Sequence, residues 1–207
     1  MHAAFEILGY RSEHGMKINK RKGIQISLPL DNEKVMEVVA PIVMQADAFS
    51  DFPYPMLYRE LDKNFPGSKF ILTTRETQAW INSVHRHFLH RAPDGLFEWI
   101  YGVPTVRDNR SRFIEVYETH NAAVRKYFEN RPHDFLELSI ELLKDFQPIC
   151  EFLNLPCSEE PFPIKNRGKY RGLRRRFKPV RDGWKHVWKA PAKIRKLVFG
   201  TFRTNNR

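Results

Sequence analysis

Arg75 and Ser83 have the residue types and the spacing of a phosphate-binding pair. Residues 69–74 read Lys-Phe-Ile-Leu-Thr-Thr and predict a buried strand, and a helix is expected to begin near Thr77. Ligands of open α/β sheets bind beyond the carboxyl ends of the strands, which is where Arg75 would lie. Its guanidinium could hold a phosphate through two parallel hydrogen bonds, and the Ser83 hydroxyl could add a third. As structural alternatives, Arg75 caps the sheet edge and Ser83 faces solvent or bonds the preceding turn.

The apolar pattern around this pair predicts strands that alternate with helices. Asp31 is a suitable N-cap for a helix, because its short side chain can accept hydrogen bonds from the first helical turn. Pro66 and Gly67 mark a turn ahead of the strand. The other elements expected are a short strand over 10–14, a strand end or loop over 46–52, a strand over 135–138, and helices over 31–44, 54–65, 77–89, 111–128 and 146–153. This alternation implies an α/β fold with a parallel sheet and helices on both faces.

Several segments resemble the small P-loop sulfotransferase-like family, whose members use 3′-phosphoadenosine 5′-phosphosulfate (PAPS). In that family a strand ends in arginine and a serine follows eight residues later, as Arg75 and Ser83 do. The resemblance covers roughly residues 3–166 and is carried by residues 58–62, 65–72, 75, 80, 117–121, 127–128, 152–156 and 161–163. It implies a three-layer P-loop NTPase-like sandwich in which Arg75 and Ser83 bind the 3′-phosphate. It also implies PAPS as the co-substrate and no metal ion.

The family's opening strand and phosphate loop, of the form G-x-P-[KR]-[ST]-G-T-[ST], have no matching pattern in this sequence. Residues 1–10 instead resemble the helix that follows this loop in the family. The backbone N–H groups of such a loop bind the phosphosulfate end of the nucleotide. The resemblance therefore predicts an α/β domain over 1–164 that lacks its first strand and P-loop. We expect the coding sequence to continue upstream of Met1 with both elements.

Asp51 is the candidate catalytic residue. Sulfuryl transfer to a hydroxyl needs a general base near the acceptor oxygen and positive charge near the leaving phosphate. The loop after a strand that ends near Ala48 should open onto the cleft, and Asp51 lies in that loop. A structural alternative is that Asp51, which precedes Phe-Pro, caps the following turn. Asp47 is a second candidate on the same segment.

The positive charge of the chain is concentrated at its C-terminal end. Residues 165–207 contain 16 lysines and arginines and one acidic residue, a net charge of +15, whereas residues 1–164 have a net charge of −4. We therefore predict a basic C-terminal tail after the α/β domain. The tail would be a solvated extension, an anionic-membrane contact through Trp184 and Trp188, or a polyanion-binding segment. No apolar run approaches the ~20 residues needed to span a bilayer.

These observations predict a sulfotransferase-like protein that transfers a sulfuryl group from PAPS to an acceptor hydroxyl or amine. Two alternatives stay open. One is an inactive fragment or pseudo-enzyme that retains the 3′-phosphate half of the site. The other is a polyanion- or membrane-surface-binding protein that acts through residues 165–207. The expected location is cytoplasmic or membrane-peripheral, and the residues do not name the acceptor.

Overall fold

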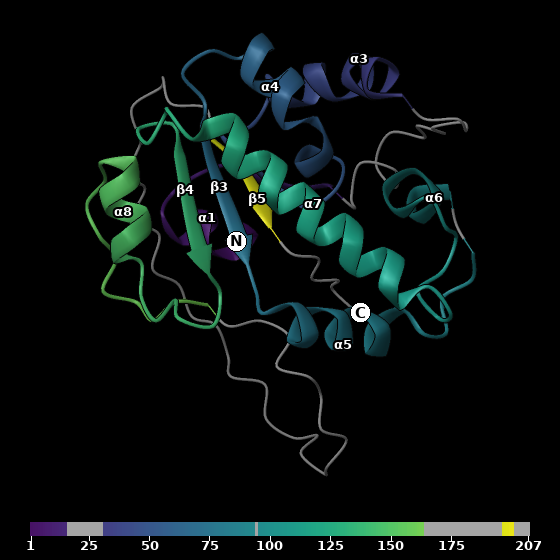
Figure 1. The fold of residues 1–207 in the computed structure, drawn as a ribbon. Helices are drawn as coiled ribbons and strands as arrows, with labels where there is room; N and C mark the ends of the chain where they lie inside the picture. Colours follow the sequence, from purple (N-terminus) through teal and green to yellow (C-terminus); the bar gives the residue numbers. More distant parts are fainter. Residues whose placement is uncertain (16–30, 94, 164–195, 201–207) are drawn as a thin grey trace, which may run out of the picture.

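In the described part of the chain, five parallel strands form one sheet (Figure 1). The computed structural model describes residues 1–15, 31–93, 95–163 and 196–200. Every neighbouring pair of strands is parallel, and the spatial order is β1-β2-β5-β3-β4. The predicted α/β class with a parallel sheet is therefore confirmed. The strands are β1 (Ser12–His14), β2 (Ala48–Ser50), β3 (Lys69–Thr74), β4 (Phe135–Ser139) and β5 (Lys196–Gly200).

The strand β3 is buried on both of its faces. Its four central residues, 70–73, are at most 3% exposed. A continuous apolar run of this kind is typical of parallel strands that are covered by helices on both sides. Phe70 is in register with Leu197 of β5 on one side and with Phe135 of β4 on the other. The strand predicted over 69–74 is thus an interior strand of the sheet.

Three helices cover one face of the sheet: α3 (Asn32–Val43), α4 (Tyr58–Asn64) and α7 (Arg110–Phe128). The helix α3 begins where the sequence predicts, because the Asp31 side chain accepts a hydrogen bond from the Lys34 N–H. Phe128 of α7 anchors the contact with the sheet. Its ring centroid lies 4.8 Å from that of Phe70 and 5.2 Å from that of Phe135. These aromatic contacts fix α7 across β3 and β4.

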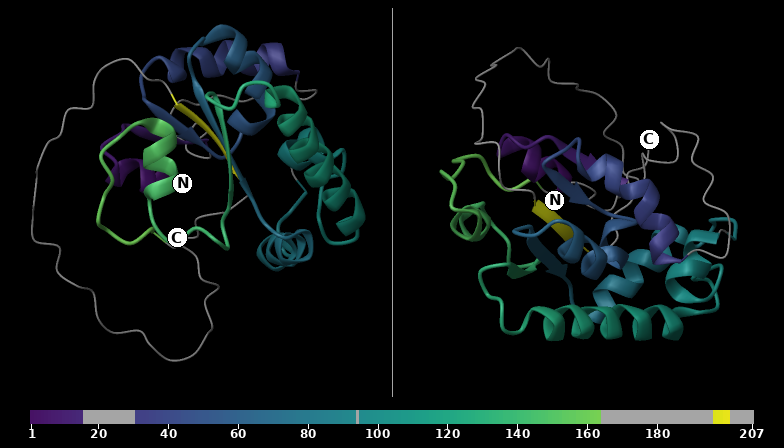
Figure 2. Two further views of the ribbon diagram at one scale, coloured as in Figure 1. Left: turned by 60° about the vertical axis from the view of Figure 1, so that its left-hand side comes forward. Right: turned by 90° about the horizontal axis from the view of Figure 1, so that it is seen from above.

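The opposite face is covered by α1 (His2–Ile7) and α8 (Gln147–Leu153), which together with the sheet bury Phe5, Ile71 and Ile149 completely. The two views of Figure 2 show these helices and the α3, α4 and α7 layer on opposite sides of the sheet. A separate aromatic cluster joins α5 (Thr77–Phe88), α6 (Gly95–Tyr101) and α7 beyond the sheet. A short 3-10 helix, η2 (Tyr54–Leu57), leads from β2 into α4.

The position of β5 differs from the sequence-based expectation for this part of the chain. Residues 165–207 are predicted to be a tail outside the α/β domain, yet the strand Lys196–Gly200 lies between β2 and β3 in the sheet. The rest of the predicted tail, residues 165–195 and 201–207, lies outside the described residues. Among the described helices, none combines the length and the apolar character that a membrane span requires.

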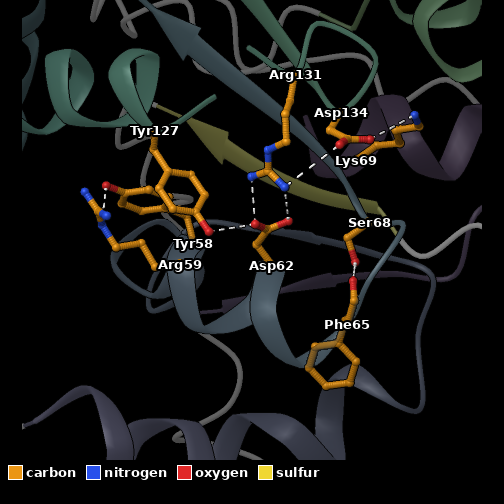
Figure 3. Close-up of polar contacts among 9 residues, drawn as sticks. All are labelled: Tyr58, Arg59, Asp62, Phe65, Ser68, Lys69, Tyr127, Arg131 and Asp134. Atoms are coloured by element: carbon orange, nitrogen blue, oxygen red, sulfur yellow. Dashed lines mark hydrogen bonds and ion pairs between the residues drawn. The ribbon is translucent and has the colours of Figure 1, made fainter. Parts of the chain in front are cut away.

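Residues of α4 and of the end of α7 form a polar cluster at the amino end of β3 (Figure 3). The Asp62 carboxylate accepts two hydrogen bonds from the Arg131 guanidinium, of 2.7 and 3.1 Å, and one of 2.7 Å from the Tyr127 hydroxyl. The guanidinium of Arg59 lies over the rings of Tyr58 and Tyr127. This cluster joins α4 to the end of α7, so these residues have a structural role at the edge opposite to the strands' carboxyl ends.

We expect substitution of Asp62 by alanine to destabilise the fold by about 1.5–3 kcal/mol. The change removes charge-assisted hydrogen bonds to a carboxylate that is 13% exposed. Urea unfolding measures this loss. The control is Lys126→Ala, which breaks an exposed ion pair with Glu129 and should cost about 0.5 kcal/mol or less. Equal losses for the two variants would contradict a structural role for the Asp62 cluster.

Candidate active site

The carboxyl ends of the parallel strands meet at one edge of the sheet, and two of the sequence-predicted site residues, Asp51 and Arg75, lie at that edge. Asp51 follows β2 directly and Arg75 follows β3 directly. Both therefore lie at the edge where open α/β sheets bind ligands. Asp47 precedes β2 at the opposite end, where Arg11 holds its carboxylate through two side-chain hydrogen bonds of 2.9 Å. This ion pair gives Asp47 a structural partner away from the candidate site.

Asp51 is held in an unusual backbone conformation. Its φ is 68°, a left-handed value that few residues other than glycine adopt. The side chain is 9% exposed, and its Oδ1 accepts a 2.8 Å hydrogen bond from the Phe52 N–H. This hydrogen bond to the adjacent residue holds the Asp51 side chain at the start of the turn. The second oxygen, Oδ2, faces His14. Strained residues that persist in a fold often have a functional role, which makes Asp51 a candidate on geometric grounds.

His14, at the end of β1, is the partner of Asp51. Its Nε2 lies 3.3 Å from Asp51 Oδ2, and its Nδ1 lies 3.5 Å from the Ser50 hydroxyl. The His14 side chain is 13% exposed. The His2 ring from the start of α1 stacks on His14 at 5.7 Å and contacts the Ser12 hydroxyl at 2.8 Å. The sequence reasoning missed His14, although a histidine at the end of a short predicted strand over 10–14 was the available signal.

Burial raises the pKa of Asp51 to about 6. A desolvated carboxylate is less stable than its neutral acid, so the proton is held more tightly. The Phe52 N–H and the α-amino group of Met1 lower this pKa, but their effect is smaller than that of burial. Asp51 therefore changes its charge near neutral pH, as a general base that works at neutral pH should.

The backbone of Arg75 is fixed by Tyr117 of α7. The Tyr117 hydroxyl accepts a hydrogen bond from the Arg75 N–H and donates one to the Arg75 carbonyl, both of 2.9 Å. The Tyr117 ring stacks on Trp80 of α5 with centroids 4.1 Å apart. The Arg75 side chain is 28% exposed, and its Nε donates to Glu141 at 3.1 Å. A cation with a fixed backbone and partial exposure is suited to bind an anion from solvent.

Ser83 lies in the second turn of α5 and is half-buried. The helix begins where the sequence predicts, because the Glu76 carboxylate accepts hydrogen bonds from the Gln78 and Ala79 N–H groups. Within the described ranges, no hydrogen bond or ion pair joins any two of Asp51, Arg75 and Ser83. The structure thus brings Asp51 together with His14 and Arg75 with Glu141, and it leaves Ser83 apart from both pairs.

A cavity of about 40 Å³ lies beneath the edge, between Phe52, Trp80, Tyr117 and His120. This volume can hold one or two water molecules and is too small for a nucleotide. Burial lowers the pKa of His120 to about 4, which keeps this histidine neutral at physiological pH. Trp80 is 1% exposed and packs in the core.

Comparison with known proteins identifies the family of this chain. A family model described as a sulfotransferase domain matches residues 1–107 and, in a second match, residues 88–170. These matches cover most of the chain, so the protein belongs to the sulfotransferase domain family, as the sequence motifs predict. Ava biosynthesis cluster protein M of Aspergillus versicolor is 27% identical over 141 residues, covering 56% of this chain. The chain spans about half the length of that relative, 53% of it.

The raised pKa of Asp51 predicts a pH-dependent stability. The native state binds this proton more tightly than the unfolded state, whose pKa is near 3.8. The protonated Asp51 carboxyl therefore stabilises the native state below pH 4. As the pH rises through about 6, this contribution is lost and the free energy of unfolding falls by up to about 3 kcal/mol. Asp51→Asn should remove this loss, which urea unfolding between pH 4 and 7 measures.

Asp47→Asn is the matched control for this experiment. The hydrogen bonds from Arg11 lower the pKa of Asp47, so its contribution to stability is present above the ordinary pKa and is lost as the pH falls. The variant should be less stable than the wild type at pH 7 and should approach it in acid. For each variant, the measured quantity is its difference in stability from the wild type as a function of pH. If this difference had the same sign and the same slope for Asp51→Asn and Asp47→Asn, the raised pKa of Asp51 would be contradicted.

Proposed function

We propose that this protein transfers a sulfuryl group from PAPS to an acceptor hydroxyl or amine. The observation that carries the proposal is the sulfotransferase domain match over residues 1–170, within which Asp51 and Arg75 lie at the carboxyl edge of a parallel sheet. In the reaction the acceptor oxygen attacks the sulfur atom. The S–O bond to the 5′-phosphate then breaks, and 3′,5′-bisphosphoadenosine leaves with the bonding electron pair.

Arg75 and Ser83 are the proposed ligands of the 3′-phosphate. Arg75 lies in the β3–α5 connection and Ser83 in the second turn of α5, so a guanidinium and a hydroxyl would approach one anion from the strand end and from the helix. The Tyr117 hydrogen bonds support this role, because they hold the Arg75 backbone while its side chain is partly exposed. Binding of the phosphate would replace the contact between Arg75 and Glu141.

Asp51 is the proposed general base, and His14 is the residue that positions it. When His14 Nε2 carries a proton, it donates to Asp51 Oδ2 and orients the carboxylate. The acceptor's O–H proton passes to Asp51 as the new S–O bond forms. Low exposure on both side chains limits competition from water.

The inactive alternative is a pseudo-enzyme that retains only the 3′-phosphate half of the site. Such a chain would bind 3′,5′-bisphosphoadenosine without turning over PAPS. The third possibility is a protein that binds a polyanion or an anionic membrane. The net charge of +15 over residues 165–207 would attract such a partner to that segment. Its binding would weaken steeply as the salt concentration rises.

We expect Arg75→Ala to weaken the binding of 3′,5′-bisphosphoadenosine by about 1.5–3 kcal/mol, roughly ten- to 150-fold. Glu141→Gln should tighten binding, because it removes a carboxylate that competes with the phosphate for Arg75. Calorimetry with this ligand and with 5′-AMP, which has no 3′-phosphate, measures both effects. Arg86→Ala, an exposed change on α5, is the control. Equal losses for the two nucleotides would contradict the role of Arg75.

Catalysis should depend on Asp51 and on its protonation. The rate of PAPS consumption should rise with pH through about 6, as the carboxylate ionises. We expect Asp51→Asn to reduce kcat by about 10²–10⁴-fold while bisphosphate affinity stays unchanged. A panel of alcohols, phenols and amines as acceptors provides the assay. Bisphosphate binding without turnover of any acceptor would favour the inactive alternative.

A further inference from the structure

The chain contains two cysteines, Cys150 and Cys157, and both are free thiols. Cys150 lies in α8 and is 3% exposed, whereas Cys157 is exposed in the segment that follows this helix. Neither residue belongs to the candidate active site, and the proposed function makes no use of either thiol. Their position relative to each other is therefore a separate property of the fold.

The chain reverses its direction at the end of α8. Asn154, the residue after the helix, has a left-handed φ of 50°, which is typical of a residue that ends a helix. The next residue, Leu155, donates its N–H to the Cys150 carbonyl at 2.9 Å. Further along, the Phe162 ring packs on Phe146, which precedes α8, with centroids 5.2 Å apart. The segment after the helix thus runs back along it.

This return path places the Cys157 thiol within hydrogen-bonding reach of the Cys150 thiol. The N–H of Ser158 also donates to the Cys150 sulfur, so the segment contacts the helix at the cysteine itself. Cys150 packs in one cluster with Ala4 of α1 and with Phe146, both 0% exposed. Two cysteines can form a disulfide without a large backbone movement only when their side chains already face each other, as these two do.

We propose that Cys150 and Cys157 form a reversible disulfide, which makes the end of α8 a redox-sensitive site. The oxidant is hydrogen peroxide. The Cys157 sulfur attacks one oxygen of the O–O bond, which gives a sulfenic acid and releases the other oxygen as water with the thiol proton. The Cys150 sulfur then attacks the Cys157 sulfur. The S–S bond forms, the S–O bond breaks, and the departing hydroxide leaves with the Cys150 proton as a second water molecule.

The two sulfur atoms differ in the way that these steps require. An oxidant in solution reaches an exposed cysteine, and the thiolate is the form that reacts with it. Cys157 is exposed, so it meets the peroxide first. Burial and the neighbouring Cys157 raise the pKa of Cys150 to about 11, so Cys150 is a protonated thiol at neutral pH. Cys150 therefore acts second, as the cysteine that resolves the sulfenic acid.

Treatment of the reduced full chain with a slight excess of hydrogen peroxide tests the proposal. The free thiol count, measured after denaturation, should fall from two to zero, and the mass should fall by that of two hydrogen atoms. A digest should contain a peptide in which Cys150 is linked to Cys157, and dithiothreitol should restore both thiols. Addition of oxygen atoms without loss of hydrogen, or a disulfide between two copies of the chain, would overturn the proposal.

Two single substitutions assign the order in which the sulfur atoms react. Cys157→Ser, an exposed change, should leave the fold intact and slow the loss of the remaining thiol at least about ten-fold, because Cys150 is buried. Cys150→Ala should still react at Cys157 and gain one oxygen atom as a sulfenic acid, which dimedone traps. Equal oxidation rates for the two variants would contradict the assignment of Cys157 as the first residue to react.

Thermal unfolding tests whether the disulfide fits the native fold. The oxidised protein should have a Tm about 4–8 °C above that of the reduced protein, because a cross-link restricts the unfolded chain. Cys157→Ser treated with peroxide in the same way is the control and should show no change in Tm. A lower Tm for the oxidised wild type would overturn the proposal. These measurements do not depend on sulfuryl transfer, so their failure would leave the proposed function untouched.

Discussion

The pairing of β5 with both β2 and β3 is the constraint on which the rest of the structure depends. Buried parallel strands must satisfy their backbone hydrogen bonds with other strands, because helices on both faces exclude water. Ala48 and Phe49 of β2 and Phe70 and Ile71 of β3 are all 0% exposed. Only a strand between them can pair these segments, and the helical layers can pack on both faces only because the sheet is continuous.

The same sheet separates the candidate site into two parts with different electrostatics. On the β2 side, Asp51 and His14 are largely buried, and desolvation raises the pKa of the carboxyl group. On the β3 side, Arg75 is partly exposed and is paired with Glu141 through one nitrogen. The first environment suits proton transfer and the second suits the capture of an anion from solvent. A reaction that needs both would take place across the end of β5.

Asp62, Tyr127 and Arg131 join α4 to the end of α7 and have a structural role. Asp62 accepts hydrogen bonds from Arg131 and Tyr127 at the amino end of β3. Asp51 and Arg75 lie at the opposite, carboxyl end of the strands. The two hydrogen bonds from Arg131 to the largely buried Asp62 carboxylate fix the position of α4 relative to α7.

The local sequence pattern by itself determined three elements. A buried apolar run gives β3, the Asp31 cap gives the start of α3, and a helical repeat of apolar residues gives α7. Each of these signals depends only on residues that are near neighbours in the sequence. It also selected Arg75 and Asp51 as residues that follow strands. Only the tertiary structure decided that His14 contacts Asp51 and that 196–200 enters the sheet, because these contacts join segments far apart in the chain. Register and spatial order depend on backbone pairing across the sheet, which no local pattern records.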